Sequence, residues 1–376
     1  MRNFPFPRAG TPRLLRLGAT GQVVLLFMLI LGGAQLAIRG PLTTILAAST
    51  QKAYVANGAS DTVSVIDVAT NTVVATIATD PYPVGIAASP DGAHVYTANN
   101  VGDSISVIDT GTALVSQTIS LPVGTGPFGV AVSPDNQRLY VAGYGPVAGG
   151  TGAAAPPFYR SDADMRSEAY ATTAQNTVFV IDTASGTVTN TVLVGTNPHS
   201  LVVSPDGANL YVTNTVDRTV SVVSTATLGA VATIPVQADP YGIAITPNGS
   251  TVYVANDADS TASVIDTSTN SVVATVPIGT APYGVVVNRA GTLAYITNAV
   301  DHTISVIDTG TNSVVGTVPV AGIEPYGISI TSDGRYVYST LCEDGKISVT
   351  DTATNTVVAT VMVGAGPQDV VIPPAR

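Results

Sequence analysis

The chain repeats one unit of about 42 residues, and this period limits the fold more than any other feature. The tyrosine of the unit recurs at steps of 42, 44, 71, 42, 42 and 43 residues. Its seven positions are Tyr54, Tyr96, Tyr140, Tyr211, Tyr253, Tyr295 and Tyr338. Four short strands at such a spacing are typical of a β-propeller blade. The sequence therefore predicts an all-β fold, a seven-bladed β-propeller of four-stranded antiparallel blades.

The clearest copy of the unit occupies residues 282–322 and contains four β runs. The runs are Val285–Val287, Leu293–Thr297, Thr303–Asp308 and Val314–Val318. We name them strands A to D, from the channel outward. Strand A follows a Pro-x-Gly corner and strand B carries the repeated tyrosine. Because strand direction alternates, the B–C and D–A loops of all blades are expected on one face.

The first and last repeats are each incomplete. The repeats begin at a strand B, residues 53–57, with no strand A ahead of it. Residues 367–372 have the spacing of a strand A, and no strand B follows. We expect this C-terminal strand to pair with residues 53–57 and complete the first blade. Such closure removes two open sheet edges.

Two short motifs recur in register with the blades. One is Tyr54-Val-Ala-Asn57, with copies at 211–214, 253–256 and 295–298; the other is Val-Ile-Asp, as in Val306-Ile-Asp308. The chain resembles the YVTN-family β-propeller repeat proteins of bacterial and archaeal envelopes over about residues 51–376. This resemblance implies a surface-layer protein, a periplasmic binding protein or a member of a lactonase branch. It specifies the fold and leaves the chemistry open.

Residues 1–50 differ in composition from the repeats. They contain five arginines and no acidic residue, with an apolar run from Val23 to Leu31 that continues weakly to Ile38. This pattern predicts a secretory signal peptide, which we prefer, or a single membrane anchor. In either case the repeats of residues 51–376 are expected outside the cytoplasm: periplasmic, on the cell surface or secreted. Contact with a membrane is expected only through an uncleaved N-terminal segment.

Charge and cysteine content exclude several classes of function. After residue 50 the chain has 25 acidic and nine basic residues, a net charge of −16. A surface this negative disfavours nucleic acid as a partner. The single cysteine, Cys342, excludes a Cys-x-x-Cys metal or haem-attachment motif. The B–C loop aspartates suit turn capping better than a calcium site. No cofactor and no metal site are predicted.

One blade carries an insertion of 29 residues in its B–C loop, at about residues 145–173. It begins rich in Gly, Ala and Pro and then becomes polar and aromatic, with Phe158, Tyr159 and Arg160. Long loops in compact domains are usually functional or disordered. Because B–C loops share a face with D–A loops, the insertion is predicted to reach the mouth of the channel and contribute to binding.

The residue after the corner proline is the best candidate for a binding position. Around the ring it is Val84, Phe128, His199, Tyr241, Tyr283, Tyr326 and Gln368. Five ring-bearing side chains therefore fall on consecutive blades, from Phe128 to Tyr326. Such an aromatic arc suits a sugar, a cation or a side chain of a partner. The other interpretation is that these rings only pack between the blades.

Catalysis is the alternative interpretation of the same corner. His199 stands where three other blades have Tyr, while Asp239 and Glu324 precede their corner prolines. A histidine working as a general base needs a carboxylate or a substrate within hydrogen-bond reach. The alternative catalytic set is therefore His199, Asp239 and Glu324.

These observations predict a monomeric, non-enzymatic scaffold that binds or displays through its D–A/B–C face. The expected partner is a protein, a glycan or a small molecule. The alternative is a lactonase-like hydrolase or lyase with its site at the channel mouth. A third possibility, a component of a periplasmic redox system, requires a partner that supplies the cofactor.

Overall fold

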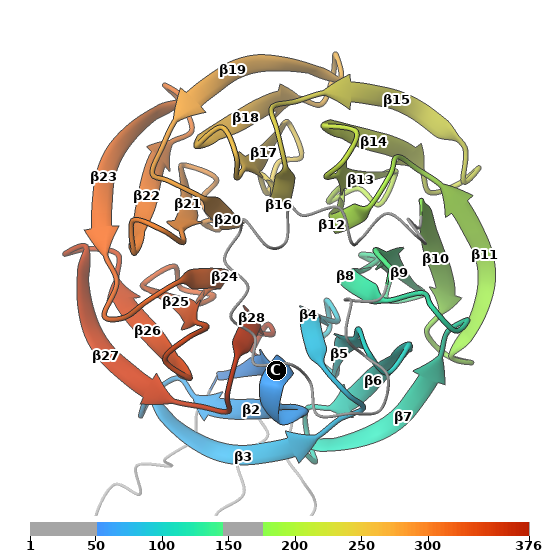
Figure 1. The fold of residues 1–376 in the computed structure, drawn as a ribbon, viewed down its shortest axis with the longest axis horizontal. Coiled ribbons are helices and arrows are strands. Elements are labelled where there is room, and N and C mark those ends of the chain that lie inside the picture. Colours follow the sequence, from blue (N-terminus) through green and yellow to red (C-terminus); the bar gives the residue numbers. More distant parts are fainter. Residues whose placement is uncertain (1–50, 146–175, 376) are drawn as a thin grey trace, which may run out of the picture. The chain divides into compact units, whose positions relative to one another are not determined.

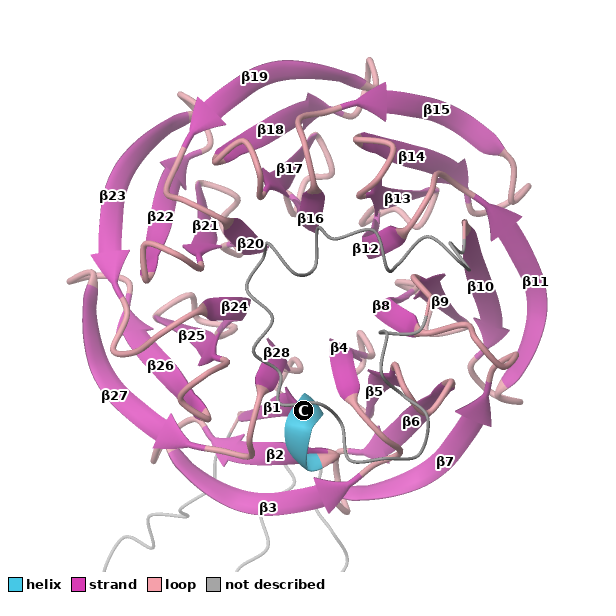
Figure 2. Ribbon diagram, in the orientation of Figure 1, coloured by secondary structure: helices cyan, strands magenta, loops and turns pink. Residues whose placement is uncertain are grey.

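The computed structural model describes residues 51–145 and 176–375, which lie within one compact unit, Ala47–Arg376. Seven four-stranded antiparallel sheets are arranged radially around a central channel (Figure 1). A short 3-10 turn, Gly58–Ser60, is the one helical element among the described residues (Figure 2). The predicted seven-bladed propeller is confirmed.

Each blade has its strands in the order A to D from the channel to the rim. The A strands are β4 (Pro83–Ala88), β8 (Pro127–Val132), β12 (Pro198–Val203), β16 (Pro240–Ile245), β20 (Pro282–Val287), β24 (Pro325–Ile330) and β28 (Pro367–Val371). The B strands are β1 (Lys52–Asn57), β5 (His94–Asn99), β9 (Arg138–Gly143), β13 (Asn209–Asn214), β17 (Thr251–Asn256), β21 (Leu293–Asn298) and β25 (Tyr336–Leu341).

The two outer sets complete the sheets. The C strands are β2 (Thr62–Asp67), β6 (Ser104–Asp109), β10 (Thr177–Asp182), β14 (Thr219–Ser224), β18 (Thr261–Asp266), β22 (Thr303–Asp308) and β26 (Lys346–Asp351). The D strands are β3 (Thr72–Ala78), β7 (Leu114–Ser120), β11 (Thr187–Leu193), β15 (Ala230–Pro235), β19 (Ser271–Pro277), β23 (Ser313–Pro319) and β27 (Thr356–Met362).

The hydrophobic core lies between neighbouring blades. B and C strands are buried along most of their length, because both of their faces meet another blade, whereas D strands are largely exposed. One inter-blade cluster joins Tyr211 and Val222 of one blade to Val252 and Ile265 of the next. Small and β-branched side chains suit such thin layers covered on both sides.

The asparagine that ends the repeated Tyr-Val-x-Asn motif has a structural role. In β17 the Asn256 amide donates to the hydroxyls of Thr261 at 3.1 Å and Ser263 at 2.9 Å on β18. Equivalent bonds occur in other blades, for example from Asn298 to Ser305 at 2.9 Å. The motif therefore ties strand B to strand C in the five blades whose strand B ends in Asn, whereas β9 ends at Gly143 and β25 at Leu341.

The first blade is closed by the far end of the chain. Strand β28 pairs antiparallel with β1, with Tyr54 opposite Val371. The Gln51 side chain also donates to the carbonyl of Pro373 at 3.0 Å. The predicted closure is therefore confirmed.

The two faces of the ring differ in the loops that form them. We call the face of the A–B hairpins and C–D turns the turn end, and the face of the D–A and B–C loops the mouth end. The expected shared face of D–A and B–C loops is confirmed by contacts between them, such as Tyr82 N donating to Asp61 Oδ1 at 2.8 Å.

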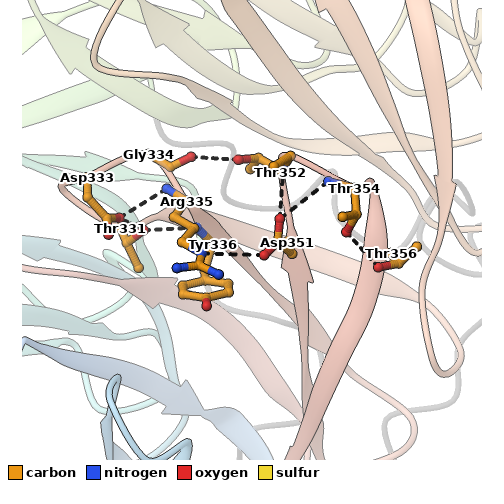
Figure 3. A network of polar contacts seen from close by, with 10 residues as sticks. Thr331, Asp333, Gly334, Arg335, Tyr336, Asp351, Thr352, Thr354 and Thr356 are labelled. Atoms are coloured by element: carbon orange, nitrogen blue, oxygen red, sulfur yellow. Dashed lines mark hydrogen bonds and ion pairs between the residues drawn. The ribbon is translucent and has the colours of Figure 1, made fainter.

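Polar capping repeats at the turn end. In the A–B hairpin of the seventh blade, Asp333 accepts hydrogen bonds from the Thr331 hydroxyl and from the backbone N–H of Arg335 (Figure 3). Asp351 of the adjoining C–D turn accepts from Arg335 Nε at 3.4 Å and from Thr354 N at 3.3 Å. These aspartates are turn-capping residues, as their turn positions predict.

Candidate functional site

The corner before each strand A adopts one backbone conformation in all seven blades. The residue before the proline has a positive φ in every case. These residues are Tyr82, Gly126, Asn197, Asp239, Ala281, Glu324 and Gly366. Gly, Asn and Asp tolerate this left-handed region best. The aspartate at position 239 is thus explained by backbone geometry as well as by any chemistry.

The corner also brings neighbouring A strands into close contact. A Cβ added to Gly242 would lie 2.1 Å from the carbonyl oxygen of Tyr283 on the next blade. The same applies to Gly284 and the carbonyl oxygen of Tyr326, at 2.4 Å. Glycine is required because the backbones touch there. This approach places the residues that follow the corner prolines side by side at the mouth end.

The five predicted rings form one continuous cluster, which we call the ring cluster: Phe128, His199, Tyr241, Tyr283 and Tyr326. Centroid distances along it are 4.0 Å from Phe128 to His199, 4.7 Å from His199 to Tyr241, 5.1 Å from Tyr241 to Tyr283 and 4.6 Å from Tyr283 to Tyr326. Aromatic pairs at 4.5–7 Å attract each other through their ring edges and faces. The arc expected from the sequence is therefore a contiguous surface, while its use in binding stays a prediction.

His199 lies at the centre of the ring cluster and is 3% exposed. Its Nε2 is 3.2 Å from the Tyr283 hydroxyl, and its Nδ1 is buried without a hydrogen-bond partner. Burial lowers the pKa of His199 to about 3. The imidazole is therefore neutral at physiological pH and a weak base.

The tyrosine beside it is also shifted. Burial, and then the neighbouring Tyr241 and Tyr326, raise the pKa of Tyr283 well above its ordinary value. Its phenol stays protonated, so it acts as a hydrogen-bonding group and as an apolar ring face. The ring cluster consequently carries no charge of its own at neutral pH.

The alternative catalytic carboxylates are not bonded to His199, whose Nδ1 has no partner and whose Nε2 meets Tyr283. Glu324 instead accepts from the Tyr326 hydroxyl at 3.3 Å, and its backbone N–H donates to His302 Nδ1 at 3.2 Å. Asp239 accepts from the backbone N–H of Asp257 through its own carbonyl at 3.0 Å. The structure thus groups the predicted rings, and no hydrogen bond joins His199 to Asp239 or Glu324.

The central channel contains a cavity of about 230 Å³. All seven A strands line it, and Phe128, His199 and Tyr283 bound it at the mouth end. Its one acidic side chain among the described lining residues is Asp369 of β28. The Asp369 carboxylate accepts from Val370 N at 2.8 Å and from Ile86 N at 3.3 Å. Burial raises the pKa of Asp369 to about 7.

The aspartates of the B–C loops act as clamps on the adjoining D–A loops. Asp103 accepts from Gly124 N at 2.7 Å and from Gly126 N at 2.8 Å. Asp301 similarly accepts from Thr280 N at 2.8 Å. No group of three His, Cys, Asp or Glu residues within 51–145 and 176–375 is arranged to hold a metal ion. The carboxylates of Asp103 and Asp301 instead accept the hydrogen bonds that cap the D–A loops.

Some predicted features lie outside the described residues. These are the N-terminal segment 1–50 and the insertion, including Phe158, Tyr159 and Arg160. In the part of the chain that is described, no helix has the length and hydrophobicity needed to cross a membrane.

The sequence analysis missed three residues at the site. Tyr82 is buried, and Tyr144 packs against Phe128 at 5.4 Å and His199 at 5.6 Å. Tyr144 lies outside the repeated corner, so the repeat gave no reason to select it. Tyr82 precedes the corner proline, as Asp239 and Glu324 do in their blades. Asp369 did carry a signal, because the other six blades have Gly or Ser at that place.

The fold and this channel define a class: a seven-bladed β-propeller whose features fit a YVTN-type repeat protein. Residues 20–145 match the family model for YNCE-like β-propellers. Among curated protein sequences, none matches the chain.

Two solved structures show the same architecture. A chain of Kuenenia stuttgartiensis hydrazine synthase is 20% identical, with 76% of this chain and 88% of that chain covered at a TM-score of 0.63. A functionally unknown protein from Desulfotomaculum acetoxidans DSM 771 is 14% identical, with 87% and 100% covered at a TM-score of 0.71. At these identities the similarity shows the fold alone.

Proposed function

We propose that this protein is an exported, non-enzymatic binding scaffold that takes a ligand, or a group of a partner, at the mouth end. The observation that carries the proposal is the ring cluster, an uncharged group of five rings of which Phe128, His199 and Tyr283 line the channel cavity. Cavities that combine apolar side chains with a few well-placed polar groups are the usual form of a ligand site. A β-propeller supports such a role because rigid blades hold the loops in place.

The surrounding loops add support for a partner surface. Large apolar side chains in loops are exposed at the mouth end: Val123 is 98% exposed, Val216 59% and Val300 53%. Exposed apolar groups beside a pocket are a feature of interaction sites.

A lactonase-like hydrolase or lyase has less support from the geometry. General base catalysis by His199 needs a pKa near the working pH and a carboxylate or substrate that orients the ring. The pKa of His199 is about 3, because burial disfavours the imidazolium. Its observed neighbours are rings rather than Asp239 or Glu324.

Export is proposed from the N-terminal composition. The arginines of residues 1–50 and the apolar run Val23–Leu31 form the pattern of a signal or anchor. Fractionation of cells that express the full chain, with N-terminal sequencing of the product, tests this. A product retained in the cytoplasm with an intact N-terminus would remove export from the proposal.

The binding role is tested with a panel of small molecules rather than with an assumed ligand. Monosaccharides, aliphatic amines and aromatic compounds are titrated against the full chain by calorimetry, and against the Tyr241→Ala and Tyr336→Ala variants. We expect one class to bind wild type and to lose about tenfold in affinity in Tyr241→Ala. Tyr336, which lies at the turn end, provides the matched control. Binding that is equal in wild type and Tyr241→Ala would overturn the proposed site.

A further inference from the structure

A single carboxylate interrupts an otherwise uncharged channel. The third residue of each A strand is glycine or serine in six blades and aspartate in the first blade, which β28 closes. These residues are Gly85, Gly129, Ser200, Gly242, Gly284, Gly327 and Asp369. In the blades that have glycine this position is crowded, because a Cβ added to the glycine would lie 2.1–2.4 Å from backbone atoms of the next blade. An aspartate there is a departure from what packing alone favours.

The Asp369 side chain is held between two blades. Its Oδ1 lies 2.4 Å from where a Cβ on Gly327 would stand, so the glycine of the seventh blade makes room for the carboxylate. On the other side, Ile86 N of β4 donates to its Oδ2 at 3.3 Å. Two backbone donors use part of the acceptor capacity of a carboxylate, which has about four lone-pair sites.

The described lining contains no positive charge to pair with Asp369. The other ionisable groups that line the cavity are His199 and Tyr283. The first is neutral because burial lowers its pKa to about 3, and the second stays protonated because burial raises its pKa. A buried carboxylate is costly unless it is protonated or paired. Burial accordingly raises the pKa of Asp369 to about 7.

A second buried group with one unpartnered atom lines the same cavity. His199 is 3% exposed, lines the cavity, and leaves Nδ1 without a hydrogen bond. Buried polar atoms of this kind are usually satisfied by protein, water or ligand. The rings of Phe128 and Tyr283 line the same cavity and pack against His199, with centroids 4.0 Å and 5.5 Å from its ring. Aromatic rings attract organic cations.

We propose that the channel cavity binds a small protonated amine, with Asp369 as its counter-charge and the rings of Phe128, His199 and Tyr283 in contact with its carbon atoms. This inference rests on the proposed binding function and names the ligand class of the same site. A metal ion suits the cavity less well, because one carboxylate and aromatic faces do not supply its oxygen ligands. An anion would be repelled by Asp369.

The test is calorimetric titration of the full chain with butylammonium at pH 8, with 1-butanol as the neutral molecule of matched shape. We expect butylammonium to bind and 1-butanol not to bind. Asp369→Asn should lower the affinity for butylammonium at least about tenfold, because the ammonium group loses its charged partner. Asp206→Asn, which changes an aspartate at the turn end, is the control and should leave the affinity unchanged.

The affinity of wild type for butylammonium should also fall between pH 8 and pH 5, whereas that of Asp369→Asn should not change with pH. The sign follows because Asp369 becomes protonated below about pH 7, while His199 and Tyr283 remain neutral over this range. If Asp369→Asn does not fold, Asp369→Gly restores the residue of five other blades and serves as the second variant.

Three results would overturn the inference. They are equal binding of butylammonium to wild type and both Asp369 variants, equal binding of 1-butanol, and full displacement by potassium at the same concentration. If butylammonium fails while another compound still binds in a Tyr241-dependent manner, the proposed function stands and the amine assignment is wrong. If nothing binds in a Tyr241-dependent manner, both fail.

Discussion

The two ends of the propeller use the same residue types in opposite ways. At the turn end, Asp206 is exposed and accepts from the Ser204 hydroxyl and Ala208 N, and these hydrogen bonds lower its pKa. Just inside the mouth end, burial raises the pKa of Asp369 to about 7. The Asp206 carboxylate stabilises a hairpin, whereas burial of the Asp369 carboxylate costs free energy. A cost of this kind is a sign of function.

Tyrosines show the same division. The strand-B tyrosines are buried between blades, and Tyr253 donates to Asn312 Oδ1 of the next blade at 2.8 Å. Tyr283 of the mouth end is partly exposed and meets His199 rather than a backbone turn. Repetition of a residue in every blade therefore indicates structure, and departure from it indicates a site.

The largest expected effect is a pH dependence that originates in Asp369. Its pKa is about 7 in the folded protein and near 3.8 in the unfolded chain. The folded state thus retains a proton that the unfolded state has lost, and this contribution disappears as the pH rises through 7. Urea unfolding should show wild type losing up to about 4 kcal/mol between pH 4 and pH 8 relative to Asp369→Asn. Parallel pH profiles for the two proteins would contradict the comparison.

A matched tyrosine pair separates the two ends next. Tyr253→Phe should lower the free energy of unfolding by about 1–2 kcal/mol, because Asn312 Oδ1 loses its donor. It should leave binding at the mouth end unchanged. Tyr283→Phe removes the partner of His199 Nε2 and should change that binding. Urea unfolding and calorimetry on both variants provide the measurement, and a binding defect in Tyr253→Phe alone would reverse the assignment.

A smaller effect is expected from a single hairpin cap. Asp206→Ala should cost about 1 kcal/mol at pH 7, because the Ala208 N–H and the Ser204 hydroxyl lose their acceptor. The pKa of Asp206 is lowered by these bonds, so its contribution is present above about pH 4 and is lost as the pH falls through the folded value. The difference from wild type should therefore shrink in urea unfolding as the pH falls below the folded pKa. A difference that persists in acid would point to packing instead.

The smallest expected effect concerns backbone strain at the turn end. Ala113 has a φ of +55° at a place where four other blades have Asn with φ near +50°. Ala113→Asn should stabilise the protein by about 0.5 kcal/mol, because Asn tolerates the left-handed region better than Ala. A rise of one or two degrees in the midpoint of thermal unfolding would be the readout. Destabilisation would show that the Ala113 methyl packs too well to replace.

Most of the fold was predictable because each blade repeats the same local pattern. The tyrosine period gave the blade number, and the incomplete first repeat with residues 367–372 gave the closure. Local turn signals such as Ser204-Pro-Asp-Gly207 fixed the hairpins. These features depend on residues close in sequence, whose physical preferences are transferable from blade to blade.

The site was predictable only where it follows the repeat. The ring cluster occupies one repeated position, so its grouping could be expected. Its contact with Tyr144 depends on where a strand-B end meets the next corner, which no period encodes. The partners of His199 could not be read either, because its contacts with Tyr283 and Tyr144 join side chains from different blades.

The pairing of β28 with β1 has a consequence for how the chain must be made. During synthesis the earliest blade stays unfinished while every other blade emerges, and its exposed inner edge has no partner until the last residues arrive. A chaperone that shields this edge, or delayed folding of the whole ring, would protect the nascent chain from aggregation. The first blade can therefore be completed only after β28 has been made.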